Sequence, residues 1–192
     1  MKLIAIGAFA LATLAAGAAS AQAQQQVTHG APIPGLCTYS LQRALGQSTA
    51  GQSLRSGLQR LAQEVQGELQ PYATSLESEA QQLQSAGPID PNNQAYQAWQ
   101  GRLQQFQQLQ QTREAELRYT DAMQTQAIGA AAGPIITALY QERGCSILLN
   151  ESVVLLGNPA MDLTDTVVQR LNQALPTLPA FNRMQVPPQQ QQ

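Results

Sequence analysis

Hydrophobic positions between residues 52 and 85 recur in groups of three, and each group lies eleven residues after the one before. The groups are Leu54, Leu58 and Leu61, then Val65, Leu69 and Tyr72, then Leu76, Ala80 and Leu83. An eleven-residue period corresponds to about 3.67 residues per turn, so these side chains stay on one face of a nearly straight helix. The pattern therefore predicts one long helix that does not wind as a left-handed coiled coil.

Residues 87–93 are rich in Gly, Pro and Asn, which favour a turn. A second helix is expected from about 94 to 143, with an apolar side made of Tyr96, Trp99, Leu103, Phe106, Leu109 and Leu117. Two long helices joined by a short turn must lie antiparallel, here in register about Asp90, and the shorter one extends about 50 Å. The sequence thus predicts a protruding helical arm over 52–133, with its tip at 87–93.

Glycine and proline interrupt both predicted helices. Pro71 lacks an N–H, and its ring crowds the carbonyl of Gly67, where the missing side chain eases a bend. Gly133 and Pro134 repeat this arrangement near the base of the returning helix. These four residues are hinge candidates, and the alternative is that a solvated helix simply tolerates them.

Short apolar segments flank the arm on both sides. Residues 36–40 are expected to form a strand, and 145–149 and 153–156 are expected to form a tight β-hairpin around 150–152. A final helix follows, for which Asp162 or Thr164 can act as the cap. Its apolar side consists of Leu163, Val167, Val168, Leu171 and Leu175.

Residues 36–51 and 134–175 would together form a β-rich body at the base of the arm, which makes the fold α+β. Three short strands and one small helix bury too little apolar surface to be stable alone. We therefore expect the body to complete its core with further copies of the chain.

The two ends of the chain have different compositions from the rest. Lys2, the apolar run 3–16 and the small residues that follow predict a secretory signal peptide over 1–23, cleaved near Ala21 or Ala23. The apolar run is shorter than the ~20 residues that span a bilayer, so no stable membrane insertion is expected. Residues 24–35 and 176–192 are rich in Gln and Pro and are expected to be disordered tails.

Charge and candidate chemistry argue against several classes of function. The net charge is -2, and Lys2 is the only lysine. The scattered arginines form no basic patch for nucleic acid. His29 is the only histidine, which leaves no basis for a catalytic triad, a metal site or a cofactor. The carboxylate pairs Glu77/Glu79 and Glu114/Glu116 are spaced two apart, so their members face different sides of a helix and are expected to be solvated.

The chain has two cysteines, Cys37 and Cys145, and each lies in a predicted strand. The signal peptide would deliver them to an oxidising compartment, where a disulfide between them is expected. That bond would join the two ends of the arm insertion. Two buried free thiols, or bridges between subunits, are the alternatives.

Three segments carry a resemblance to a known family: YSLQRAL at 39–45, GCSILLN at 144–150 and DLTDTVVQRLN at 162–172. With the order of the predicted elements, they make residues 36–174 resemble the Skp/OmpH family of periplasmic chaperones. The resemblance implies a homotrimer with a β-barrel body and three helical arms around a cavity. Such a trimer holds unfolded outer-membrane proteins, its clients, without ATP.

Scattered leucine and aromatic side chains on the arm would offer weak apolar contact to clients, and Tyr96, Trp99, Leu103 and Phe106 are the first candidates. The alternative is that these four side chains only pack the second helix against the first. The arms carry Gln where the family often has Lys, which argues against lipopolysaccharide binding. A function of another class also fits the sequence, namely a structural coiled-coil spacer or scaffold of the cell envelope.

Overall fold

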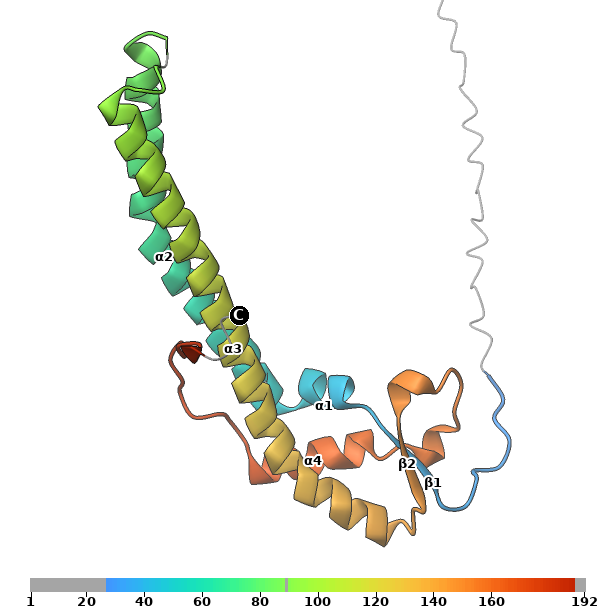
Figure 1. Cartoon of the computed structure of the whole chain (residues 1–192). Helices are drawn as coiled ribbons and strands as arrows, with labels where there is room; N and C mark the ends of the chain where they lie inside the picture. Colours follow the sequence, from blue (N-terminus) through green and yellow to red (C-terminus); the bar gives the residue numbers. More distant parts are fainter. Residues whose placement is uncertain (1–26, 89, 189–192) are drawn as a thin grey trace, which may run out of the picture.

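The computed structural model describes residues 27–88 and 90–188, which form a long arm and a small body (Figure 1). The elements in chain order are β1 (Leu36–Tyr39), α1 (Leu41–Gln47), α2 (Thr49–Ser85), α3 (Gln94–Glu142), β2 (Ile147–Asn150), the 3₁₀ turns η1 (Glu151–Val153) and η2 (Pro159–Met161), and α4 (Thr164–Ala174). The expected signal peptide lies outside the described residues. Of the expected N-terminal tail, 27–35 are described, and they contain no helix or strand.

The arm is the predicted helical hairpin. Both helices lie within three residues of their predicted bounds. Glu68 pairs with Arg113 and Glu79 pairs with Arg102, and both pairs lie symmetrically about the turn next to Asp90, as the predicted register requires. The buried members of the α2 stripe are Leu54, Leu61, Val65 and Leu76. Tyr72 is the exception, because it is 54% exposed.

α1 is a separate helix that the sequence pattern does not predict. The Ser40 hydroxyl caps it by accepting from the Arg43 N–H, and the Ser48 hydroxyl caps α2 by accepting from the Gly51 N–H. Gly51 also allows the two helices to approach closely, because an added Cβ would lie 1.7 Å from the Leu45 carbonyl oxygen. Two serine caps and one glycine therefore produce the sharp corner between α1 and the arm.

The predicted β-hairpin is wrong. β2 pairs in parallel with β1, from Leu36 opposite Ile147 to Tyr39 opposite Asn150. The Asn150 side chain accepts from the Ser152 N–H and starts the 3₁₀ turn η1 in place of a β-turn. Residues 153–156 consequently form no strand, and the described sheet has two strands where three were expected.

The expected disordered tail at 176–192 also differs from the structure over its described part. Residues 176–188 leave α4 and run beside the lower part of the arm (Figure 1). Leu178 is buried in a cluster with Leu54, Ile128 and Leu171. The composition suggested disorder because this segment has no periodicity of its own, but the arm supplies its partners.

The core lies where the body meets the base of the arm. One cluster joins α2, α3, α4 and Leu178. A second cluster joins the two cysteines to Leu139, Leu163 and Val167. α4 contributes to both through the apolar side predicted for it, with Leu163, Val167, Val168 and Leu171 all buried. The short final helix thereby fixes the arm to the sheet.

Candidate functional site

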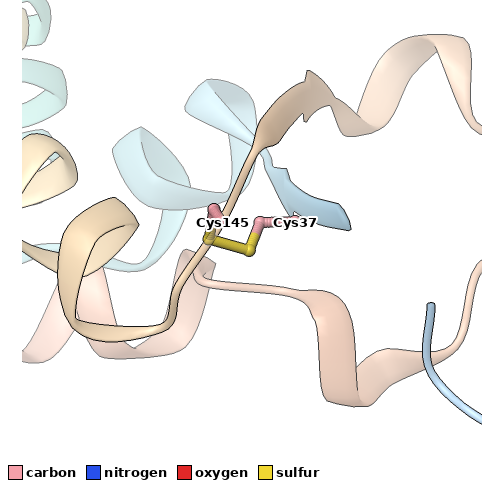
Figure 2. The surroundings of a disulfide bond; sticks show 2 residues. All are labelled: Cys37 and Cys145. Carbon is pink, nitrogen blue, oxygen red and sulfur yellow. A yellow bond between two sulfur atoms is a disulfide. The ribbon is translucent and has the colours of Figure 1, made fainter. Parts of the chain in front are cut away.

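A disulfide between Cys37 and Cys145 closes the body (Figure 2). The two Cα atoms are 5.8 Å apart, within the usual range, and both residues are buried. The bond lies in one cluster with Leu139 at the end of the arm and Leu163 before α4. It joins residues 108 apart in the sequence, so the whole arm is enclosed between its two ends.

An arginine in α1 holds this helix against the loops before α4. Arg43 Nε donates to Glu151 Oε2 at 2.8 Å, and its guanidinium also pairs with Asp162. The carboxylates raise the pKa of Arg43, with the hydrogen bond to Asp162 as the largest effect. Burial raises the pKa of Asp162, but hydrogen bonds from Thr164 and Arg43 outweigh it and hold that pKa below its usual 3.8.

The first and last segments that carried the family resemblance meet in this body. The Ser40 N–H donates to Thr164 Oγ1 at 2.9 Å, in a buried position. About two turns further along α4, Asn172 Oδ1 accepts from the Thr49 N–H at 2.8 Å. Together with Arg43, these bonds align α1 and the start of α2 alongside α4. The motifs therefore specify how the body is assembled.

The four client-contact candidates line one side of α3, and each is half-buried. The Trp99 indole N–H donates to the Leu76 carbonyl oxygen on α2 at 3.0 Å. The Tyr96 ring stacks on Trp99 with ring centroids 6.0 Å apart. Phe106 lies at the rim of a shallow hollow of about 500 Å³ that is otherwise lined mainly by α2, including Val65 and Leu69. Packing against α2 is thus visible for Trp99 and Phe106, and a role for Tyr96, Trp99, Leu103 and Phe106 in client contact remains a prediction.

The four hinge candidates lie inside continuous helices. Pro71 is within α2, and Pro134 is within α3. A Cβ added at Gly67 or Gly133 would meet nothing within 4 Å, so close packing does not require either glycine. Their role as hinges remains a prediction.

A cluster of charges that the sequence pattern did not predict lies halfway along the arm. Arg113 on α3 pairs with Glu68 on α2 at 2.5 Å and with Glu116 at 3.0 Å. Arg183, from the C-terminal segment, pairs with Glu68 at 3.1 Å and with Glu116 at 2.8 Å. The hydrogen bond from Arg113 is the main cause that lowers the pKa of Glu68 below its usual 4.5. We call these four residues the mid-arm ion cluster.

The carboxylate pairs point in different directions, as their spacing predicted, but not all of them are solvated. Glu114 is exposed and pairs with Arg118, whereas the Glu116 side chain is only 8% exposed. Glu79 is half-buried and pairs with Arg102. The expectation of solvation is therefore wrong for Glu116 and Glu79. For Glu79, the signal that could have located it is the spacing about the turn, which matches Glu79 on α2 with Arg102 on α3.

Within residues 27–88 and 90–188, no group of three or more His, Cys, Asp or Glu side chains is arranged to hold a metal ion. None of the helices in the same part of the chain combines the length and the apolar character needed to cross a bilayer. The arrangement as a whole is a base with a buried core and a disulfide, and it carries a long, mostly polar arm.

Residues 35–171 match the family model described as outer membrane protein (OmpH-like). The chain belongs to the OmpH-like family. Its structure is similar, with a TM-score of 0.71, to the crystal structure of a Caulobacter crescentus protein named an OmpH-like outer membrane chaperone. The two chains are 33% identical over 86% of this chain and 98% of the other. A search of curated proteins finds no match.

Proposed function

We propose that this OmpH-like protein is an ATP-independent periplasmic chaperone that holds unfolded outer-membrane β-barrel proteins between its arms. Support comes from the family and from the Caulobacter crescentus relative named an outer membrane chaperone. The observation that carries the proposal is the arm itself. Its upper part projects from the body, and both of its helices face solvent along most of their length. Many weak contacts along several such arms would keep a client from aggregating without holding it at any one point.

Several arms require several copies of the chain. Four large apolar side chains in β2 and in the residues that follow it are exposed, namely Ile147, Val153, Leu155 and Leu156. Leu155 is 96% exposed, and several exposed apolar side chains within one short stretch of chain favour association with a partner. A two-stranded sheet is also marginal in isolation. We propose that this stretch completes the body by association with further copies, most simply as a trimer.

The test of oligomerisation is sedimentation in dilute buffer. The wild-type chain is expected to sediment as a trimer, and Leu155→Glu is expected to give monomers because it places a charge in the proposed interface. Leu41→Gln is a matched control, since Leu41 is also an exposed leucine but lies on α1. A wild-type chain that stays monomeric at all concentrations would contradict the proposal.

The test of chaperone activity uses an outer-membrane β-barrel protein diluted from urea. Light scattering is expected to stay low when the oxidised chain is present in molar excess, without any nucleotide. The alternative function, a spacer or scaffold of the cell envelope, gains some support from Tyr96, Trp99, Leu103 and Phe106, because these candidates are half-buried in the arm. Unchanged scattering at any excess of the chain would favour the spacer.

A further inference from the structure

The C-terminal segment 177–188 lies along the seam between α2 and α3 in the lower part of the arm. Through most of its length it is neither helix nor strand, so its peptide groups depend on other partners. Near α4, Thr177 shares a hydrogen bond with Ser53 on α2. Residues 181–184 are held by five residues of the arm, namely Gly57, Arg60 and Glu68 on α2 and Glu116 and Thr120 on α3. We call these five residues the arm seam. The segment lies beyond residue 171, where the match to the family model ends.

The arm seam recognises the main chain of this segment at two points. Arg60 Nη2 donates to the carbonyl oxygen of Phe181 at 2.6 Å. The N–H of Met184 donates to Thr120 Oγ1 at 2.8 Å. The Thr120 hydroxyl, which is fully buried, donates in turn to the Glu116 carbonyl oxygen at 2.7 Å. Peptide groups are common to all polypeptides, so these two contacts would suit any extended chain.

Two side chains of the segment also find specific partners. The Phe181 ring lies over Gly57 so closely that a Cβ added to the glycine would come within 2.3 Å of it. Arg183 is held between the carboxylates of Glu68 and Glu116. Residues two apart lie on the same side of an extended chain, which explains how the ring and the guanidinium both reach the seam.

From these contacts we propose that the arm seam is a binding site for extended polypeptide in which an arginine follows two positions after an aromatic residue. The chain's own C-terminal segment occupies the site, and an unfolded client displaces it. The proposal rests on the chaperone function proposed above. Strands of outer-membrane barrels fit the chemistry, because they carry aromatic residues at both membrane interfaces and side chains of one face at every second position.

Hydrogen exchange of the Met184 amide measures whether the segment is docked. The amide is expected to exchange slowly in the chain alone and at least about tenfold faster when an unfolded outer-membrane protein is bound, because the client takes the seam. Complete suppression of aggregation with no change in this exchange would overturn the proposal. Failure to suppress aggregation would instead count against the chaperone function.

Two substitutions separate a binding site from a merely structural strap. Phe181→Ala empties the seam, and it is expected to raise client affinity about threefold or more because the internal competitor is weakened. Gly57→Ala fills the space that takes the aromatic ring, so it is expected to loosen the segment and lower client affinity. The matched control is Asn182→Ala, since Asn182 is exposed between the two anchoring residues. A strap without a binding role predicts that the first two variants change client affinity in the same direction, and that result would overturn the proposal.

A labelled synthetic peptide with the sequence of residues 176–188 tests the site without any client. It is expected to bind the Phe181→Ala chain saturably, as measured by fluorescence anisotropy. A peptide carrying Phe181→Ala and Arg183→Ala is expected to bind at least about tenfold more weakly, because it lacks both anchoring side chains. Equal binding of the two peptides would show that the seam does not read these side chains and would overturn the proposal.

Discussion

The lower and upper parts of the arm are built from the same two helices but are supported differently. The lower arm, residues 49–71 and 108–135, contacts α4 and the C-terminal segment, and it contains the fully buried Leu61 and Ile128. In the upper arm, residues 72–107, the described contacts are those between α2 and α3, such as Glu79 with Arg102 and Trp99 with Leu76. Burial is thus concentrated at one end of a continuous hairpin. The difference shows how one pair of helices can be a fixed part of a core and an open surface at once.

The largest expected effect tests the fixed end. Replacing Cys37 and Cys145 together by alanine removes a bond that encloses the arm and is expected to lower the free energy of unfolding by up to about 4.7 kcal/mol, the chain-entropy value for a loop of this size. Urea unfolding measures the loss. The double variant avoids a leftover free thiol, and the oxidised wild type is the reference.

Hydrogen exchange of the same double variant compares the lower arm with the upper arm directly. Faster exchange is expected in the body and at the base of the lower arm, while the upper arm should exchange as in the wild type. Equal acceleration over the whole arm would contradict the division into two parts.

Leucine substitutions compare the two parts at the level of one side chain. Leu61→Ala in the lower arm is expected to cost about 2–5 kcal/mol, because Leu61 is fully buried. Leu103→Ala in the upper arm is expected to cost about half as much or less, since Leu103 is only half-buried. Thermal unfolding followed by circular dichroism measures both. Equal losses would mean that the upper arm is packed as tightly as the lower arm.

Acid is expected to weaken the lower part of the molecule first. The pKa values of Glu68 and Asp162 are lowered in the folded chain, so each pairing contributes stability above the usual values of 4.5 and 3.8. That stability is lost as the pH falls through the lowered pKa values. The urea concentration at the unfolding midpoint, measured between pH 6 and pH 2.5, should therefore decrease once the pH drops below about 4.5. Arg113→Ala should flatten the part due to Glu68, because the hydrogen bond from Arg113 is the main cause of its lowered pKa. Arg43→Ala should reduce the part due to Asp162. An unchanged profile in both variants would exclude these pairs as the cause.

The smallest expected effect concerns the boundary between the two parts. Gly67→Ala and Gly101→Ala both place a methyl group in open space, and each is expected to stabilise its helix by up to about 1 kcal/mol. If Gly67 and Pro71 form a hinge, only Gly67→Ala should slow hydrogen exchange across residues 64–71 and reduce the capacity to suppress aggregation. The same outcome for both glycines would leave helix propensity as the whole explanation and would rule out the hinge.

Local pattern sufficed to predict the arm, its turn and the apolar side of α4, because the period of a helix is visible within a few turns of sequence. The pairing of β1 with β2 could not be predicted in this way. It joins strands separated by the whole arm, whereas the apolar run 153–156 offered a nearby partner that the structure does not use.

The features of the candidate site also differ in how far the sequence could predict them. The cysteine pairing could be expected from cysteine number and compartment, but the arm seam could not be expected from composition. Phe181 and Arg183 lie between prolines in a segment without periodicity, and their partners Gly57, Glu68 and Glu116 are far away in the sequence. The C-terminal segment is ordered by partners on other elements, so its own composition resembles that of a disordered segment.

The parallel pairing of β1 and β2 also implies an order of events during synthesis. The chain is synthesised N-terminus first, so Cys37 and the first strand are exposed long before their partners exist. The helical hairpin, in contrast, can form as soon as its second helix has been made. The sheet can then close only near the end of emergence, after a slow, long-range search. With just two cysteines present, the waiting thiol has no wrong partner within its own molecule; its hazard during that interval is a neighbouring nascent copy.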